Sequence, residues 1–170
     1  MYSARVQGMR SILRIVSLAT ALSAIVALFG VAEPVARAGG SFRWNASERC
    51  FMKKINKARA KNGLKRLRRD KQVGYVAKRH ARKMAKAESM WHDEELGSRI
   101  TNWSALAQNS GYGGKCKGLF KAFMDSPVHA ENILGDYRYF GVGARWKNNR
   151  LYVQQVFESK KNPGNVYHSP

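Results

Sequence analysis

The sequence predicts an α+β domain in which helices come first and an antiparallel pair of strands comes last. Two segments with regular helical spacing of apolar residues occupy the region between residues 47 and 87. Two strand-like segments, 139–147 and 151–158, follow near the C-terminal end and are joined at Asn148-Asn149, residues that tolerate the positive φ of a tight hairpin turn. This order implies a layered domain that ends in a hairpin.

The first helix is expected to start with Ser47 as its N-cap and to run to about Lys61, with Gly63 as its terminator. Its apolar residues have helical spacing: Phe51, Met52, Ile55 and Ala58. Ser47 therefore marks the end of an exposed lead-in, residues 39–47.

The second helix, with Asp70 as its N-cap, carries the strongest periodic signal in the chain. Its inward stripe keeps strict i, i+3, i+4 order: Val73, Val76, Ala77, His80, Ala81, Met84 and Ala85. Because His80 falls on this stripe, we interpret it as a core histidine rather than a ligand.

Regular periodicity lapses between Glu88 and Lys115, where aromatic residues lie among glycines and small polar residues. Such a long irregular span in a compact domain is usually functional, and its aromatics favour an ordered structure. A third helix is expected from Lys117 to Asp125, with four residues facing inward: Leu119, Phe120, Phe123 and Met124. Ser126 and Pro127 suit the N-cap and first positions of a further short helix, which places His129 in its first turn.

Residues 1–38 have the composition of a secretory signal peptide. A basic lead and an uncharged apolar run from Ile15 to Val31 precede a small-x-small cleavage site that ends at Ala38. An uncleaved signal anchor is the alternative. Removing 38 of the 170 residues leaves 132, enough for one domain. We assign this domain to residues 48–158, with a flexible tail at 159–170, and expect a secreted or extracytoplasmic protein.

The exported part retains two cysteines, Cys50 and Cys116, and an even count outside the cytoplasm favours a disulfide. With only two cysteines the pairing is forced. A metal site at these residues is disfavoured because the chain has no CxxC and no nearby Cys-His spacing.

The chain is strongly basic. Its 31 Lys+Arg and 11 Asp+Glu give a formal net charge of +20, of which +17 remains without the four arginines and one glutamate of residues 1–38. This charge attracts anionic lipids, acidic envelope polymers or nucleic acid, or it only solubilises the protein, and charge alone does not choose. Tryptophans could stack bases: Trp44, Trp91, Trp103 and Trp146. Since no nucleic-acid motif accompanies them, we do not expect nucleic acid as a specific partner.

Catalytic motifs are mostly absent from the sequence, which has no GxSxG, HExxH, Walker loop or Rossmann fingerprint. The acidic run Asp93–Glu95 beside His92 could supply a metal ligand or an acid/base pair, and a hydrated loop explains it equally well. His92 and His129 lie in different elements, so their spacing alone does not make them a site.

Several short segments together have a recognisable order and spacing: Ile55-Asn56 with Arg59, Ala77 with Ala81 and Met84, His92 after Met90, Ala107-Gln108-Asn109, Ser126-Pro127 with His129, Asn132-Ile133-Leu134, Gly141-Val142-Gly143, and Tyr152-Val153-Gln154 to Phe157. They resemble the CAP superfamily (SCP domain) of cysteine-rich secretory, antigen 5 and pathogenesis-related proteins, and its short bacterial exported branch in particular. The resemblance implies an α-β-α sandwich with a central antiparallel sheet. It also implies a cleft with two histidines and two glutamates, in which the histidines can hold a divalent metal such as zinc. His92 and His129 occupy the two histidine positions.

The chain departs from that pattern at both glutamates. Gln108 stands where the family has a glutamate, and Ser126 stands where longer members have the second. Glu131 is at a different position and does not replace it. An amide can neither act as a general base nor supply the charge that favours a hard cation, so Gln108 argues against catalysis and against tight metal binding.

We therefore expect an exported, monomeric, non-enzymatic binding module that acts at the cell envelope or outside the cell. A lipid, a sterol or another envelope component is the expected ligand, no cofactor is required, and the cleft candidates are His92, Gln108 and His129. Two alternatives stay open. One is a metal-assisted hydrolase of peptide or cell-wall substrate that uses both histidines, and the other is a non-specific polyanion binder.

Overall fold

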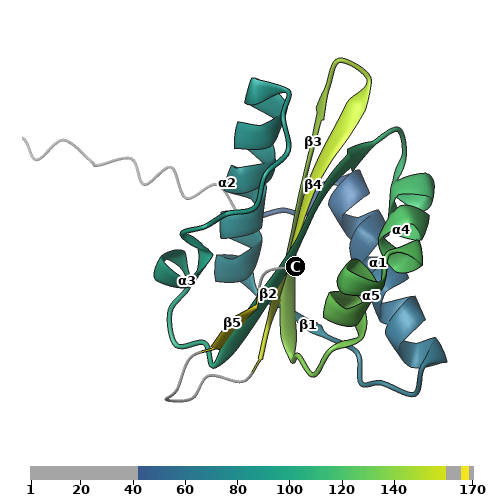
Figure 1. The fold of residues 1–170 in the computed structure, drawn as a ribbon, viewed down its shortest axis with the longest axis vertical. Coiled ribbons are helices and arrows are strands. Elements are labelled where there is room, and N and C mark those ends of the chain that lie inside the picture. Colours follow the sequence, from purple (N-terminus) through teal and green to yellow (C-terminus); the bar gives the residue numbers. More distant parts are fainter. Residues whose placement is uncertain (1–41, 160–165, 169–170) are drawn as a thin grey trace, which may run out of the picture. The chain divides into compact units, whose positions relative to one another are not determined.

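The computed structural model describes residues 42–159 and 166–168 (Figure 1), so the predicted signal peptide lies outside the described residues. In chain order the elements are α1 (Ala46–Lys61), β1 (Arg68–Arg69), α2 (Lys71–Ala87), α3 (Leu96–Arg99), β2 (Ala105–Gly113), α4 (Cys116–Asp125), α5 (Pro127–Leu134), β3 (Tyr139–Lys147), β4 (Arg150–Glu158) and β5 (Val166–His168). None of the helices in this part of the chain has the length and apolarity needed to cross a membrane.

The strands form one sheet in the order β1-β3-β4-β2-β5. The three long central strands are antiparallel, and the short strands at both edges pair in parallel. Helices α2 and α3 cover one face of the sheet, and α1, α4 and α5 cover the other (Figure 1). The predicted α-β-α sandwich with a central antiparallel sheet is confirmed.

The C-terminal hairpin forms where the sequence predicts it. Asn148 and Asn149 have φ values of 47° and 58°, and Lys147 pairs with Arg150 across the turn. Asparagine tolerates this left-handed region better than most residues, so the two-residue turn closes without a glycine.

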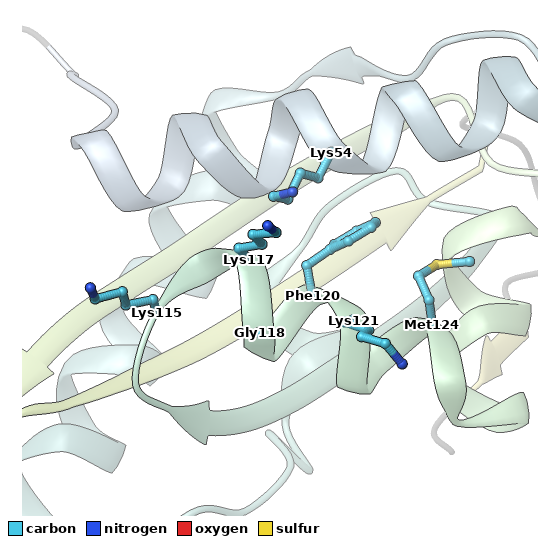
Figure 2. A pocket seen from close by; sticks show the side chains of 7 residues that line it. All are labelled: Lys54, Lys115, Lys117, Gly118, Phe120, Lys121 and Met124. Carbon is cyan, nitrogen blue, oxygen red and sulfur yellow. The ribbon is translucent and has the colours of Figure 1, made fainter.

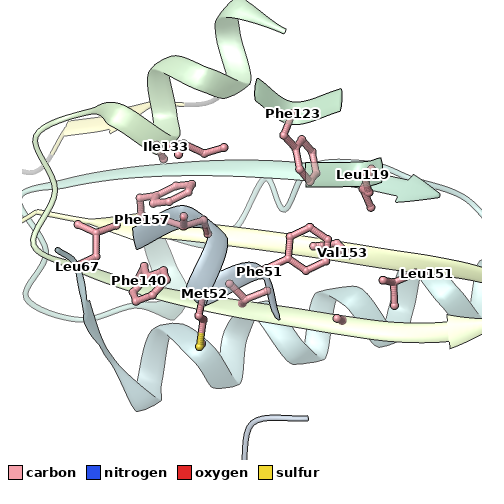
Figure 3. Close-up of a cluster of buried hydrophobic side chains, with 14 residues drawn as sticks. Phe51, Met52, Leu67, Leu119, Phe123, Ile133, Phe140, Leu151, Val153 and Phe157 are labelled. Atoms are coloured by element: carbon pink, nitrogen blue, oxygen red, sulfur yellow. The ribbon is translucent and has the colours of Figure 1, made fainter. Parts of the chain in front are cut away.

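The larger part of the core lies between the sheet and the layer of α1, α4 and α5 (Figure 3). Alternate residues of β4 face this layer, namely Leu151, Val153 and Phe157, and the intervening Tyr152 and Val156 face α2. Arg59 is almost fully buried in the same layer. It donates hydrogen bonds to the carbonyls of Ile133 and Gly135, which fixes the end of α5 to α1.

Glycines let α2 lie directly on β3. A Cβ atom built on Gly141 would sit 2.3 Å from the backbone nitrogen of Gly74, and one on Gly143 would sit 2.1 Å from the carbonyl oxygen of Ala77. The Gly-Val-Gly segment of the sequence is therefore a packing feature of the fold.

Some predicted boundaries are wrong, and one short strand was not predicted. Helix α1 begins at Ala46 rather than after Ser47, because Asn45 is its N-cap in a capping box with Glu48. The Ser47 hydroxyl instead accepts a hydrogen bond from Trp146 Nε1. Helix α4 starts one residue earlier than predicted, and the basic loop after α1 contains strand β1.

The larger error concerns the irregular span of residues 88–115. It contains α3 and the nine-residue strand β2. Periodicity missed β2 because three consecutive buried residues in its centre are polar: Gln108, Asn109 and Ser110. The segment predicted as a flexible tail includes β5, which pairs with β2.

Candidate functional site

A cleft of about 350 Å³ brings the two candidate histidines together. Three short segments line it: Met90, Trp91 and His92 after α2, Ser110 in β2, and Val128 and His129 in α5. Its apolar residues are notably open to solvent, since Val128 is 50% exposed and Met90 is 42% exposed. The cleft thus offers two imidazoles and one hydroxyl within an apolar rim.

Gln108 holds the loop that carries His92. Its Oε1 accepts a hydrogen bond from the backbone N–H of Asp93 at 2.9 Å, and its Nε2 donates to the carbonyl of the same residue at 3.2 Å. Gln154 Nε2 also donates to Gln108 Oε1, and the Ser110 hydroxyl donates to Gln154. A carboxylate at position 108 could accept the hydrogen bonds from Asp93 and Gln154 but could not donate one to the Asp93 carbonyl. The amide of Gln108 is therefore better suited to holding this loop.

The next residue in β2, Asn109, holds the helix that carries His129. Asn109 Nδ2 donates to the carbonyl of His129 at 3.1 Å, and its Oδ1 accepts from Asn132 Nδ2 at 2.9 Å. Adjacent residues of a strand point to opposite faces of the sheet. Two neighbouring amides in one strand therefore position both walls of the cleft.

Ser126 occupies the N-cap position of α5 with Pro127 at the first helical position, as predicted, but its side chain does not cap the helix. The Ser126 hydroxyl lies 2.8 Å from His129 Nδ1 instead. The His129 ring also packs edge-on against Phe123, with 5.2 Å between ring centroids. These two contacts fix the orientation of the imidazole.

His80 is only 2% exposed, as the interpretation as a core histidine predicts. Its Nε2 lies 2.8 Å from the carbonyl oxygen of Trp91 and therefore donates to it. Asp93 is buried beside it and pairs with Arg99 at 3.3 Å, so its carboxylate does not line the cleft. His80 and Asp93 therefore stabilise the loop that carries His92 through contacts outside the cleft.

The cleft is expected to hold neutral imidazoles at pH 7. Burial lowers the pKa of His92 and of His129 below the ordinary value of 6.5, and the charge of His129 lowers the pKa of His92 further. Since the unfolded chain takes up these protons near pH 6.5 and the folded chain only at lower pH, the free energy of unfolding should fall as the pH drops below about 6.5. Proton NMR titration of the imidazole rings should give pKa values below 6.5 for both. The variant His129→Gln should raise the pKa of His92, and an unchanged value would contradict this electrostatic contact.

The cleft does not fit a tightly bound zinc ion. Catalytic zinc sites use three protein ligands, whereas the lining here offers two imidazoles and no carboxylate or thiolate. Across the part of the chain that the structure describes, no three His, Cys, Asp or Glu side chains cluster closely enough to hold a metal ion.

A larger hollow, of about 690 Å³, lies between α1 and α4 and is called the α1–α4 groove below (Figure 2). Phe120 and Met124 form its apolar wall, and it has four lysines: Lys54, Lys115, Lys117 and Lys121. The ammonium group of Lys54 lies 5.7 Å from the centroid of the Phe120 ring. Lys121 pairs with Asp125, whereas the other three lysines form no ion pair within residues 42–159.

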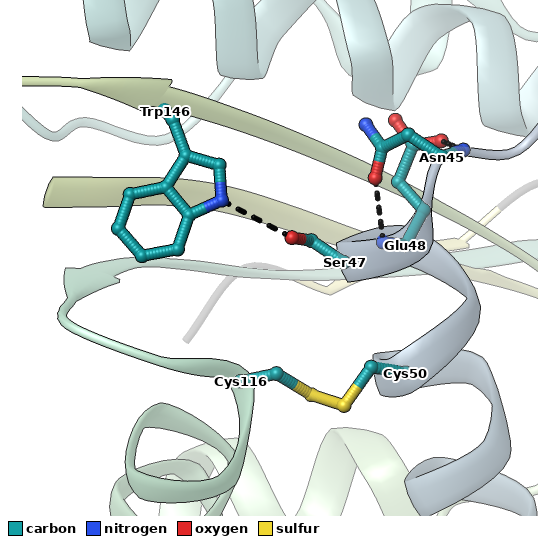
Figure 4. The surroundings of a disulfide bond; sticks show 6 residues. All are labelled: Asn45, Ser47, Glu48, Cys50, Cys116 and Trp146. Atoms are coloured by element: carbon teal, nitrogen blue, oxygen red, sulfur yellow. Dashed lines mark hydrogen bonds between the residues drawn. A yellow bond between two sulfur atoms is a disulfide. The ribbon is translucent and has the colours of Figure 1, made fainter. Parts of the chain in front are cut away.

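The predicted disulfide is confirmed and joins the two walls of this groove. Cys50 in α1 bonds to Cys116 at the start of α4, with 6.4 Å between the Cα atoms (Figure 4). Helical spacing alone does not predict the groove, because it assigns Phe120 and Met124 to the core. They are only half-buried, and the lysines that alternate with them were the available signal.

The four tryptophans do not share one surface. Trp103 is 8% exposed and donates to the carbonyl of Gly97, and Trp44 packs against Gly74. Trp91 lines the histidine cleft, and Trp146 lies on the hairpin. They form no continuous stacking platform.

An α-β-α sandwich with a single bridge between its first helix and α4, and with a two-histidine cleft supported by β2, defines a secretory-type CAP or SCP domain. The model of the CAP family, described as the cysteine-rich secretory protein family, matches residues 52–157. The chain belongs to this family, which confirms the resemblance seen in the sequence.

Solved structures agree with this assignment at the level of the fold. An outer surface protein of Borrelia burgdorferi is 18% identical with a TM-score of 0.64, and the match covers 71% of this chain and 97% of that one. An extracellular SCP-domain protein of Bacillus anthracis is 22% identical with a TM-score of 0.58, over 71% of this chain and 45% of that one. A cysteine-rich secretory protein of Staphylococcus aureus is 20% identical with a TM-score of 0.57, over 67% of this chain and 38% of that one. The comparison with curated proteins gives no match.

Proposed function

We propose that this chain is an exported CAP-domain binding protein that takes up a lipid with an anionic head group in the α1–α4 groove. One observation carries the proposal: the groove has an apolar wall, four lysines and no acidic residue among those that line it. This combination is the chemical complement of an acyl chain that ends in a carboxylate or phosphate.

The dimensions and charges of the groove suit such a ligand. Its volume of about 690 Å³ lies in the range of small-molecule sites, and each buried methylene of an acyl chain contributes about 0.8 kcal/mol. Lys54, Lys115 and Lys117 can donate charge-assisted hydrogen bonds to the head group. The Cys50–Cys116 bridge holds both walls in place, so little ordering energy is lost on binding.

Export is supported by three observations. Residues 1–38 have the composition of a signal peptide, and the disulfide suits an oxidising compartment. Similar solved structures include proteins described as outer surface, secretory and extracellular.

The test is a titration of the purified protein with a fluorescent sixteen-carbon fatty acid at physiological salt. Two kinds of variant separate shape from charge. Gly118→Leu should fill the groove without loss of charge, because a Cβ atom at this position meets nothing within 4 Å. Lys54→Gln with Lys117→Gln removes charge and leaves the hollow. Each should weaken binding at least about tenfold, which corresponds to the loss of one charged hydrogen bond or two buried methylenes.

The matched control is Lys53→Gln with Lys57→Gln, which removes the same charge from exposed positions of α1 outside the groove. It should change the affinity less than about twofold, and a sixteen-carbon alcohol should bind more weakly than the acid. Equal losses in the groove variants and the control would favour the polyanion alternative, in which charge alone drives binding.

A metal-assisted hydrolase of peptide or cell-wall substrate is the second candidate, favoured by the shared cleft of His92 and His129. Because the cleft supplies only two ligands, we expect calorimetric titration with zinc to give no tight saturable binding. The double variant His92→Ala, His129→Ala should give the same heat as the wild type. Tight zinc binding by the wild type that is absent from the double variant would overturn this expectation and support the hydrolase as the function.

A further inference from the structure

A second hollow lies at the N-terminal end of α2, in the layer across the sheet from the α1–α4 groove. Its volume is about 530 Å³. Phe42 and Val76 are half-buried in its lining, whereas Tyr75 is 65% exposed. Lys71 and Arg79, one turn of helix to either side of Tyr75, also line it. The hollow therefore combines an accessible aromatic ring with two flanking cations.

Neither of the two flanking cations is held in a close ion pair, although Arg79 lies near enough to Glu95 to help the hydrogen bond from Arg99 lower the pKa of that carboxyl group. The third cation of the hollow, Arg99, is occupied by the carboxylates of Asp93 and Glu95. Lys71 and Arg79, in contrast, form no ion pair with any residue of the described segment 42–159.

The positive charge continues along α2 beyond the hollow. Arg82, Lys83 and Lys86 are exposed, and the helix contains no acidic residue. With 3.6 residues per turn, these three residues fall in the same sector of about 120° as Lys71, Tyr75 and Arg79. The row from residue 71 to residue 86 is about 22 Å long. The result is a linear cationic track with an aromatic ring near one end.

The shape of this track distinguishes between polyanions. An interfacial helix binds a bilayer by inserting its apolar face, but the apolar face of α2 is buried against the sheet. A linear polymer with regularly spaced phosphates matches the row of cations, and a planar ring matches the hollow beside Tyr75.

We propose, in contrast to the expectation from the sequence, that the exposed face of α2 binds single-stranded nucleic acid. One base enters the hollow and stacks on Tyr75, its neighbouring phosphates contact Lys71 and Arg79, and the following phosphates contact Arg82, Lys83 and Lys86. This site is independent of the α1–α4 groove, because the two lie in opposite layers of the fold.

Fluorescence anisotropy with labelled dT12 and with an abasic strand of the same length tests the proposal on the purified protein. Tyr75→Ala leaves the charge unchanged and should weaken dT12 binding about tenfold, whereas Tyr75→Phe should bind like the wild type. The abasic strand should bind more weakly than dT12 and should not respond to Tyr75→Ala. These results require a base on the ring.

The contribution of the track is measured with Arg79→Gln and Lys83→Gln together. The loss of two phosphate contacts should make the negative slope of log K against log salt shallower by about 1.4 for both strands. Lys53→Gln with Lys57→Gln removes the same charge from α1 and should leave the slope nearly unchanged. The proposal is overturned if Tyr75→Ala binds dT12 like the wild type, if the two strands bind alike, or if both charge variants behave alike.

Discussion

Gly143→Ala is expected to lower the free energy of unfolding by at least about 3 kcal/mol, as measured by urea denaturation. The added methyl carbon would lie 2.1 Å from the carbonyl oxygen of Ala77 and 2.3 Å from its carbonyl carbon. These are backbone atoms of α2, so no flexible side chain can move aside. The helix must shift from the sheet, and the tightly packed contact between α2 and β3 is lost.

Gly114→Ala is the matched control, since a Cβ atom there meets nothing within 4 Å. It should change the free energy of unfolding by less than about 1 kcal/mol. If both variants lost the same stability, the close contact of α2 with β3 would not explain the Gly-Val-Gly segment.

Removal of the disulfide is expected to have the second large effect. The bridge spans a sequence separation of 66 residues, and in the chain-entropy model a loop of this length contributes about 4 kcal/mol. The free energy of unfolding of the variant Cys50→Ala, Cys116→Ala should therefore be about 2 to 4 kcal/mol lower than that of the wild type. It should also bind the fatty acid more weakly, because the two walls of the α1–α4 groove are no longer joined.

Reductant provides the internal control for this measurement. It should reduce the stability of the wild type to the level of the double variant and leave the variant unchanged. A reductant effect of equal size on both proteins would show that the loss does not come from this bridge.

Much of the fold can be predicted from the sequence because the relevant signals are local. The apolar stripe of α2 and the asparagine pair of the hairpin each specify an element within a few residues. Strand β2 could not be recognised in this way. Its central residues are buried amides and a hydroxyl, and only their hydrogen-bonding partners in α5, β4 and the His92 loop make that burial favourable.

The candidate site was predictable only in part. The resemblance pointed to His92 and His129, and the structure places both in one cleft, but periodicity could not separate them from surface histidines. The α1–α4 groove could not be predicted, because Phe120 and Met124 have the spacing of core residues. Whether such residues are covered depends on how the two helices pack, and the Cys50–Cys116 bridge ties α1 to the start of α4.

Photo-crosslinking tests the central claim, lipid binding in the α1–α4 groove, most directly. The probe is a sixteen-carbon fatty acid with a diazirine near its methyl end, and peptide mass mapping then locates the adducts. We predict adducts on α4, around Phe120 and Met124, and on the facing part of α1. Excess unlabelled fatty acid should abolish these adducts. Adducts concentrated at Met90 to His92 and Val128, or spread over the surface, would contradict the claim.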